Sequence, residues 1–210
     1  MTRRAYDNTR RTEQARLTRR RVLDAARDLL VERGPIAVTM RDVATRAGVS
    51  AETVYKTFGT KAALIKDVYD VTLAGDDEPI PMIDRPEIRA VLAATTPQDK
   101  LTRYAYAARG VSERTGPLLA KLLAAARSGD PVLAEFRETI NRERTFGAGS
   151  VVGQLVAIGG LRPGLDPAKA TDIVWTLIAP EVYELLVTDR GWTLDEYEKW
   201  LARMFIDALL

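Results

Sequence analysis

The fold is decided by residues 39–61, which read TMRDVATRAGVSAETVYKTFGTK. Thr39 and Ser50 stand where helices are expected to begin, because a hydroxyl just before a helix accepts a hydrogen bond from a first-turn N–H. Gly48 lies between them, and glycine adopts the positive φ of a tight turn without a Cβ clash. The spacing predicts two short helices, one on each side of a turn at Gly48.

The two predicted helices, Met40–Ala47 and Ala51–Phe58, each have one side suited to packing. Ala44 is small enough for a close helix crossing, and Val54 with Phe58 forms an apolar pair at i and i+4. The opposite side of the second helix then carries polar side chains that suit base edges and phosphates in a DNA major groove: Ser50, Glu52, Thr53, Lys56 and Thr57. The pattern predicts a helix-turn-helix that binds DNA; the alternative is three short packed helices with no ligand.

The rest of the chain has helical periodicity. From Thr18 onward an apolar stripe repeats at i, i+3, i+4 and i+7, and it ends at Gly34 and Pro35. Residues 75–86 contain three prolines and four carboxylates, which indicates a connecting segment. Further helices are expected at about residues 86–95, 97–114, 117–128, 131–159, 166–190 and 193–209. No alternating strand pattern stands out, so the sequence predicts an all-α fold.

Charge is distributed unevenly along the chain. The formal net charge is only +2, but residues 1–61 carry 14 Lys or Arg and 7 Asp or Glu, a net of +7, and the remainder carries a net of −5. Residues 1–21 alone contain eight arginines. We interpret residues 1–17 as a flexible basic arm whose Arg3, Arg4, Arg10 and Arg11 contact a minor groove or phosphates. Deleting residues 1–16 should then lower affinity and flatten its salt dependence; the alternative is a solvated tail that aids solubility.

The composition argues against an enzyme. The chain has no cysteine and no histidine, which excludes disulfides, thiol nucleophiles, Cys or His zinc sites and a Ser-His-Asp triad. The carboxylates of residues 76–78 sit in the connecting segment, and Glu181 with Glu184 lacks the histidine of a di-metal motif. We therefore expect no catalytic residues, no cofactor and no metal.

No segment is expected to enter a membrane. The most apolar window, Val151 to Leu161, is too short to span a bilayer and includes Gln154. The Arg-rich start lacks the apolar region of a signal peptide. These features predict a cytoplasmic protein with no membrane partner.

At residues 18–70 the sequence resembles the TetR family of transcriptional regulators. The resemblance is carried by Val22-Leu23-Asp24-Ala25-Ala26, Leu29, Leu30, Gly34, Thr39, Asp42-Val43-Ala44, Ala47-Gly48-Val49-Ser50, Thr53-Val54-Tyr55, Phe58, Thr60-Lys61 and Leu64. It implies an N-terminal three-helix bundle with a helix-turn-helix (residues 18–64) and a larger helical dimerisation and ligand-binding domain (residues 65–210). It further implies a homodimer that binds double-stranded DNA at a palindromic operator, most commonly a repressor released by a small-molecule effector.

The resemblance also assigns roles to single residues. Ala51–Phe58 becomes the recognition helix, and the DNA-binding set is Thr39, Arg41, Ser50, Glu52, Thr53, Tyr55, Lys56, Thr57, Thr60 and Lys61. Within it, the resemblance implies phosphate contacts for Thr39, Tyr55 and Lys61. Lys56, Thr57 and Ala62 depart from residues common in the family, which puts the base preference in doubt. Tyr55 has the alternative of a half-buried packing residue.

The C-terminal half offers weaker signals. The family places its effector pocket there, so Tyr104, Phe136 and Trp175 are expected to line it, although aromatic residues at helical spacing are more often core. Arg109 is expected to be solvated, with an anionic ligand as the alternative.

Two helix features in this half bear on assembly and on the pocket. Gly149-x-x-x-Gly153 gives one helix a smooth side, interpreted as part of a dimer interface with residues 166–190 or as an intrachain contact. Pro180 should bend the second of these helices and widen the pocket beside Trp175. The alternative function is a ligand-independent DNA-binding regulator that works through a protein partner, and it would have a filled C-terminal core.

Overall fold

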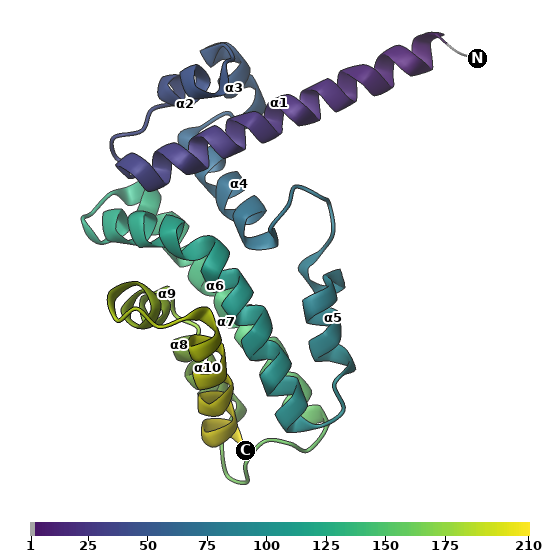
Figure 1. Ribbon diagram of the computed structural model, residues 1–210, viewed down its shortest axis with the longest axis vertical. Helices are drawn as coiled ribbons and strands as arrows, with labels where there is room; N and C mark the ends of the chain where they lie inside the picture. Colours follow the sequence, from purple (N-terminus) through teal and green to yellow (C-terminus); the bar gives the residue numbers. More distant parts are fainter. Residues whose placement is uncertain (1–2) are drawn as a thin grey trace. The chain divides into compact units, whose positions relative to one another are not determined.

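The computed structural model describes the backbone of residues 3–210 and the side chains of residues 12–210. The described residues form helices and contain no strand (Figure 1), so the all-α prediction is confirmed. They divide into two compact units: the first is Met1–Asp77 with Lys121–Leu133, and the second is Glu78–Ala120 with Ala134–Leu210. In this part of the chain no helix is long and apolar enough to cross a bilayer.

The first unit is built from α1 (Arg3–Arg33), α2 (Met40–Ala47), α3 (Ala51–Phe58) and α4 (Lys61–Ala74). Contacts join α1 to α2 and α4, and join α3 to α2 and α4. Helix α1 contributes the apolar stripe predicted from the sequence to the core of this unit. The buried residues of the stripe are Val22, Leu23, Ala25, Ala26, Leu29 and Leu30. The three-helix bundle expected around the turn is therefore present, and α4 completes it.

Helix α1 is longer than the sequence pattern indicated. It begins at Arg3 instead of near Thr18, so residues 3–17 are helical and do not form the expected flexible arm. Arginine, glutamine, glutamate and alanine favour helix, and nothing in this segment breaks it. Glu13 and Arg16 form an i,i+3 ion pair at 3.3 Å. The side chains of the four arginines expected to contact DNA from this segment lie outside the described residues.

The second unit contains the remaining helices. They are η1 (Met82–Asp84), α5 (Pro86–Ala93), α6 (Pro97–Arg127), α7 (Pro131–Ala157), α8 (Pro167–Leu177), α9 (Pro180–Tyr183), the π-helical turn η2 (Glu184–Asp189) and α10 (Leu194–Leu209). One apolar cluster fills this unit, and its largest fully buried members include Leu155, Tyr197, Leu201 and Phe205. The last turns of α6 and the start of α7 belong to the first unit.

Two helix ends that were predicted from prolines differ in the structure. A new helix was expected to begin at Pro117, but α6 continues through this residue. Gly116 lies against the Tyr183 ring, where an added Cβ would be 2.8 Å from Cε1, so tertiary packing holds a segment that local propensity would break. Pro180, in contrast, breaks its helix outright instead of bending it. Ala179 is extended, and Pro180 becomes the first residue of α9.

The boundary expected at residue 64 falls inside α4. Leu64, Ile65, Val68 and Tyr69 are all buried, and the first unit continues to Asp77. An amphipathic helix that buries this many apolar side chains remains with the core that covers them.

Candidate nucleic-acid interface

The start of α2 is held by a reciprocal pair of hydrogen bonds. The Asp42 N–H donates to Thr39 Oγ1 at 3.2 Å, and the Thr39 N–H donates to Asp42 Oδ2 at 2.8 Å. The Thr39 hydroxyl lies 2.6 Å from the same carboxylate oxygen and donates to it. These bonds hold the pKa of Asp42 below its usual range. Thr39 therefore uses its own donors within the cap, and the N–H groups of Met40 and Arg41 remain for an outside acceptor.

The turn after α2 has the geometry that the sequence predicted. Gly48 has a φ of 67° and a ψ of 39°, which is the left-handed region. The Val49 N–H donates to the Ala44 carbonyl at 3.0 Å, and Ala44 is buried on α2, which contacts α3. The small residue and the glycine together fix the angle between the two helices.

Helix α3 begins on a hydroxyl cap and packs through two side chains. The Thr53 N–H donates to Ser50 Oγ at 3.1 Å, and the two hydroxyl oxygens are 2.9 Å apart. Val54 and Phe58 are buried, and the Arg19 guanidinium lies 5.0 Å from the Phe58 ring centre. The cap and the apolar pair fix which side of α3 faces outward.

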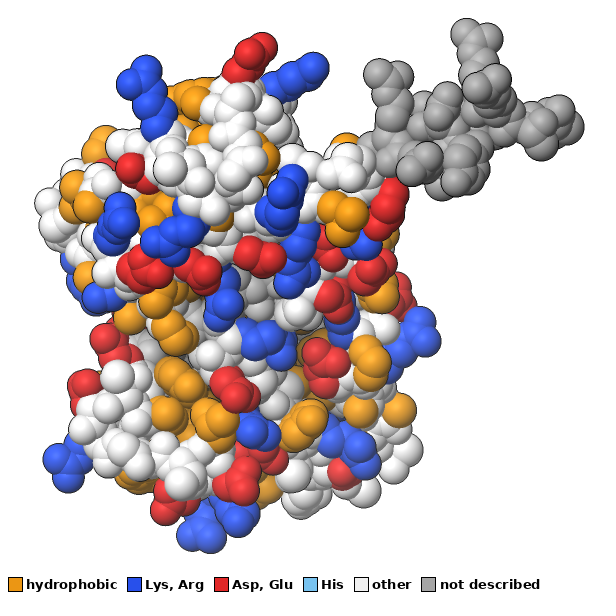
Figure 2. Space-filling model, turned by 45° about the horizontal axis from the view of Figure 1, so that its top comes forward, with side chains coloured by type: hydrophobic (Ala, Val, Ile, Leu, Met, Phe, Trp, Pro, Cys, Tyr) orange, Lys and Arg blue, Asp and Glu red, His pale blue; other side chains and the backbone are white. Residues whose placement is uncertain are grey.

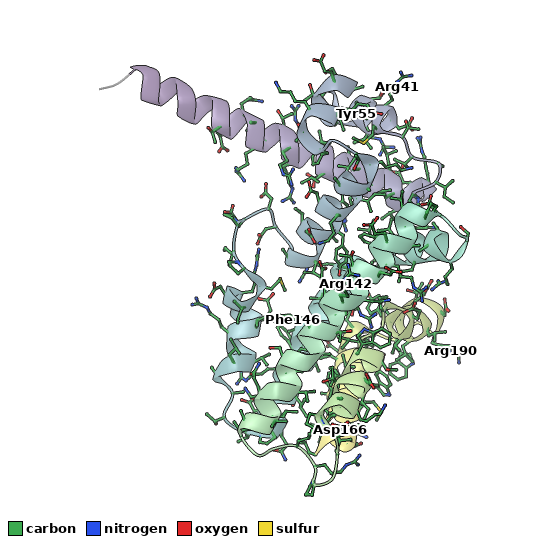
Figure 3. All side chains as sticks on the ribbon, turned by 180° about the vertical axis from the view of Figure 1, so that it is seen from behind. Arg41, Tyr55, Arg142, Phe146, Asp166 and Arg190 are labelled. Atoms are coloured by element: carbon green, nitrogen blue, oxygen red, sulfur yellow. The ribbon has the colours of Figure 1, made fainter. Side chains whose placement is uncertain are left out.

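The outward side of the helix-turn-helix holds the open polar side chains. Arg41, Glu52, Tyr55 and Lys56 are exposed, and within the described residues they make no hydrogen bond or ion pair through their side chains. Tyr55 is 52% exposed, which favours a surface contact over the packing role considered for it. Figure 3 shows Arg41 and Tyr55 among the side chains of the α2–α3 region.

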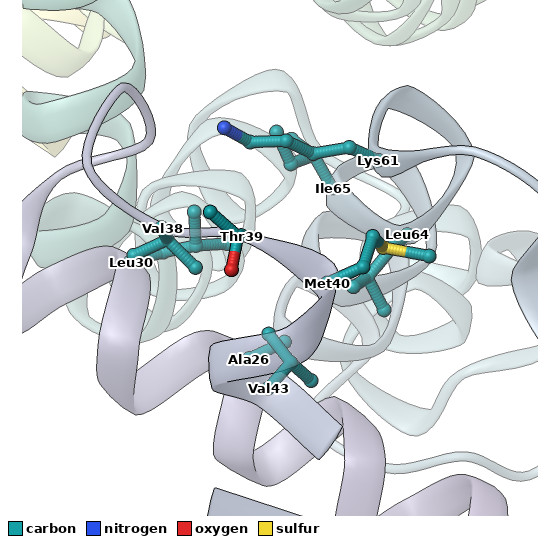
Figure 4. A pocket seen from close by; sticks show the side chains of 9 residues that line it. All are labelled: Ala26, Leu30, Val38, Thr39, Met40, Val43, Lys61, Leu64 and Ile65. Carbon is teal, nitrogen blue, oxygen red and sulfur yellow. The ribbon is translucent and has the colours of Figure 1, made fainter. Parts of the chain in front are cut away.

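The start of α4 provides a third cap and a basic side chain. The Ala63 N–H donates to Thr60 Oγ1 at 3.1 Å. Partial burial lowers the pKa of Lys61, and the carboxylates of Asp130 and Asp42 oppose that effect. The lysine stem borders a small, largely apolar pocket (Figure 4), lined by Ala26, Leu30, Val38, Thr39, Met40, Val43, Lys61, Leu64 and Ile65.

Acidic neighbours offset part of the positive charge counted in the first 61 residues. Arg46 pairs with Glu32 through two hydrogen bonds of 3.1 and 2.9 Å. Arg19 pairs with Asp67 at 3.0 Å. Figure 2 shows basic and acidic side chains intermixed on the face that it displays. The basic count along the sequence therefore overstates the positive field, since several arginines are paired with carboxylates.

The second unit brings together two of the three residues expected to line an effector pocket. Tyr104 and Trp175 both pack against its core cluster. Burial raises the pKa of Tyr104, and the charge of Arg144 partly opposes this. The Arg144 guanidinium lies 4.7 Å from the Trp175 ring centre. Phe136, the third residue of the expected lining, is buried on α7 of the same unit.

Sequence reasoning missed Arg144, which connects α7 to α8. Its Nη2 donates to the Trp175 carbonyl at 2.7 Å. That carbonyl lacks a helical partner because the Ala179 N–H turns to the Thr176 carbonyl. Pro180 indicates that α8 ends nearby and that its last carbonyls need another donor. Nothing in the sequence indicated which side chain would supply that donor.

Arg109 differs from its expected setting, whereas one end of the small-residue stripe agrees with the intrachain alternative. Arg109 is largely shielded and pairs with Glu198 at 3.4 Å. A Cβ on Gly149 would lie 3.8 Å from Thr171 Cγ2, so this end of the stripe faces α8 of the same chain. Gly153 has open space around it. Among the described residues no cluster of three or more carboxylates could hold a metal ion.

Comparisons with known proteins agree with this geometry. Residues 22–68 match the family of bacterial regulatory proteins, tetR family. The uncharacterised HTH-type transcriptional regulator YdeS of Bacillus subtilis (strain 168) is 31% identical over 171 residues, which cover 81% of this chain and 79% of that protein.

Solved structures share the fold over nearly the whole chain. The SmeT–triclosan complex superposes with a TM-score of 0.71 at 21% identity and covers 92% of each chain. TylP, a TetR regulator from Streptomyces fradiae, superposes with a TM-score of 0.65 at 20% identity, covering 93% of this chain and 87% of that one. With a matching helix-turn-helix and a relative aligned over most of its length, this chain belongs to the TetR family of transcriptional regulators, which are DNA-binding proteins and not enzymes.

Proposed function

We propose that the chain acts as a homodimeric repressor that binds a palindromic operator through α3 and leaves it when a small molecule binds the second unit. The observation that carries the proposal is the outward side of the helix-turn-helix. There Arg41, Glu52, Tyr55 and Lys56 are exposed without side-chain partners in the described part of the chain, on helices that caps hold in place.

Phosphate contacts would come from both ends of this surface. The first N–H groups of α2 and α4 follow the caps at Thr39 and Thr60, and a helix N-terminus favours an anion. The Tyr55 hydroxyl and the Lys61 ammonium add two side-chain donors. Such contacts fix the orientation of α3 on the duplex, and base contacts then supply specificity.

The dimer is proposed because one helix-turn-helix reads only a half-site. Two copies related by a twofold axis place their recognition helices about 34 Å apart, one turn of DNA. In the second unit Phe146 is 81% exposed on α7 (Figure 3), and the side of α7 at Gly153 is open. These features support an interface that includes α7.

The effector is proposed to lie near Tyr104 and Trp175. The SmeT complex with triclosan supports this, because that protein has the same fold and binds a small molecule. In this chain the Trp175 Nε1 is buried without a hydrogen-bond partner among the described residues, and a buried N–H favours a ligand that accepts a hydrogen bond. A regulator that instead works through a protein partner would show no small-molecule stabilisation in a thermal-shift screen.

Site selection from random duplexes with the purified full chain tests the proposal. We expect a palindrome to be enriched, and the double variant Tyr55→Ala, Lys61→Ala to bind it about tenfold to a hundredfold more weakly. Tyr106, which is 56% exposed in the second unit, and the exposed Lys199 supply the matched control, Tyr106→Ala with Lys199→Ala. Both variants should keep the wild-type dimer mass. Failure of the wild-type chain to bind any duplex at low salt would overturn the proposal.

A further inference from the structure

The serine and threonine hydroxyls of α2 and α3 already form hydrogen bonds within the protein. Thr57 Oγ1 donates to the Thr53 carbonyl at 2.8 Å, and Thr45 Oγ1 donates to the Arg41 carbonyl at 3.0 Å. The Ser50 and Thr53 hydroxyls lie 2.9 Å apart at the cap of α3. A hydroxyl that gives its proton to the backbone has no donor left for a base edge.

The open polar groups on α3 lie opposite its buried side. Val54 faces the core with 0% exposure, and Glu52 and Lys56 stand two residues before and after it. At about 100° per residue both point away from the core, one turn and roughly 6 Å apart along the helix axis. Within the described residues neither side chain has a partner. One is an acceptor and the other is a donor.

We propose that Lys56 and Glu52 are the base-reading pair of α3 and that they select G·C base pairs in each half-site. A lysine ammonium donates to guanine O6 and N7, and a glutamate accepts from cytosine N4 in the major groove. Their spacing of roughly 6 Å spans about two base-pair steps of 3.4 Å, so they read base pairs one or two steps apart. This inference rests on the proposed function, since it assumes that α3 lies in the groove.

Glu52 allows the pair to discriminate between half-sites with and without the cytosine. A carboxylate beside phosphates is repelled, and an amino donor in the groove compensates it; of the two such donors, cytosine N4 and adenine N6, cytosine N4 is the usual partner of a glutamate. On a half-site without that cytosine the acidic side chain therefore weakens binding. Replacing it with alanine should raise affinity for unrelated duplexes while lowering the preference for cytosine.

The experiment compares site selection by the full-length wild type, Lys56→Ala, Lys56→Arg and Glu52→Ala, with Lys199→Ala as the control. The wild type, Lys56→Arg and Lys199→Ala should enrich the same guanine. Lys56→Ala should lose it at one position in each half-site and bind the selected duplex about tenfold to a hundredfold more weakly. Glu52→Ala should lose the cytosine preference.

A single-atom change in the DNA sharpens the test. Replacing the selected guanine by 7-deazaguanine removes the N7 acceptor, so it should weaken wild-type binding and leave Lys56→Ala unchanged. An equal loss for both proteins, or a Lys56→Ala consensus identical to wild type, would overturn the inference and leave the proposed function standing. A uniform loss on all duplexes with a salt slope reduced by about one would make Lys56 a phosphate contact, which also overturns it. If the wild type binds no duplex, both proposals fall.

Discussion

In the first unit the hydrogen bonds that cap α2 and α3 join residues three positions apart, whereas in the second unit the side-chain hydrogen bonds of Lys100 and Arg144 join residues dozens of positions apart. Thr39 bonds to Asp42 across three positions. In the second unit the Lys100 Nζ donates to Gln154 Oε1 at 3.0 Å across 54 positions, and Arg144 reaches Trp175 across 31. Local contacts leave a signature in the sequence, and distant ones do not.

The two units also differ in where they place polar groups. The open polar side chains of the helix-turn-helix lie at its surface. The second unit encloses Lys100, which is only 2% exposed, and burial lowers its pKa. A buried polar group is tolerated only where specific partners meet it. The second unit therefore needs matched partners for its enclosed polar groups in addition to its apolar cluster.

The largest effect is expected at Gly116, where α6 approaches Tyr183. Gly116→Ala would place a Cβ 2.8 Å from the ring, so the side chain or the helix must shift, at a cost of about 1–3 kcal/mol in the free energy of unfolding. Chemical denaturation of wild type and variant measures the difference. Gly147→Ala is the matched control, because a Cβ there meets nothing within 4 Å, and it should stabilise the helix by up to about 1 kcal/mol.

A double-mutant cycle assigns the effect to the close approach. Combining Gly116→Ala with Tyr183→Leu should recover part of the loss, because the smaller side chain removes the contact. If Gly116→Ala proves stabilising, or if its cost is the same in both backgrounds, the tight packing of α6 against Tyr183 is not what keeps α6 continuous through Pro117.

The next effect is expected at the cap of α3. Ser50→Ala removes the acceptor of the Thr53 N–H and should cost about 1 kcal/mol in unfolding free energy. It should also loosen α3 and weaken operator binding. Ser150, exposed within α7, provides the control, since Ser150→Ala removes no cap and should change stability by less than about 0.5 kcal/mol. Equal effects at both serines would show that the cap does not organise α3.

The sequence predicted the first unit well because its determinants are local. The caps at Thr39 and Ser50, the turn at Gly48 and the buried pair on α3 were all expected and are all present. The ion pairs that arginines form, such as Arg19 with Asp67, were not predicted, because such contacts depend on how α1 and α4 pack. The outward arrangement of α3 was predictable, but which of its hydroxyls would be bound internally was not.

The second unit was predicted in outline only. Pro117 and Pro180 carry the same local signal, yet α6 continues through the first and α8 ends before the second. The difference lies in what packs nearby, which a single sequence does not show. Nothing in the sequence marked Arg144 or Lys100, because their acceptors are carbonyls and an amide that only the folded chain brings to them.

The smallest predicted effect concerns a helix cap formed by residues close in the sequence, which occurs in both units. The second unit also has a reciprocal cap, in which the Thr193 N–H donates to Glu196 Oε2 at 2.8 Å, and this helix start was expected from the sequence. Hydrogen bonds from Thr193 lower the pKa of Glu196, as those from Thr39 lower the pKa of Asp42.

Because folding lowers the pKa of both carboxyls, the unfolded chain binds their protons more tightly than the folded chain. Their stabilising effect is complete above the ordinary carboxyl pKa of about 4 and is lost as the pH falls through the lowered values. Asp42→Ala and Glu196→Ala should each lower the melting temperature slightly at pH 7, and the difference from wild type should shrink at pH 3. A difference that stays constant with pH would mean that the cap works without the carboxylate charge. If only Asp42→Ala lowers the melting temperature, the reciprocal cap stabilises the first unit and not the second.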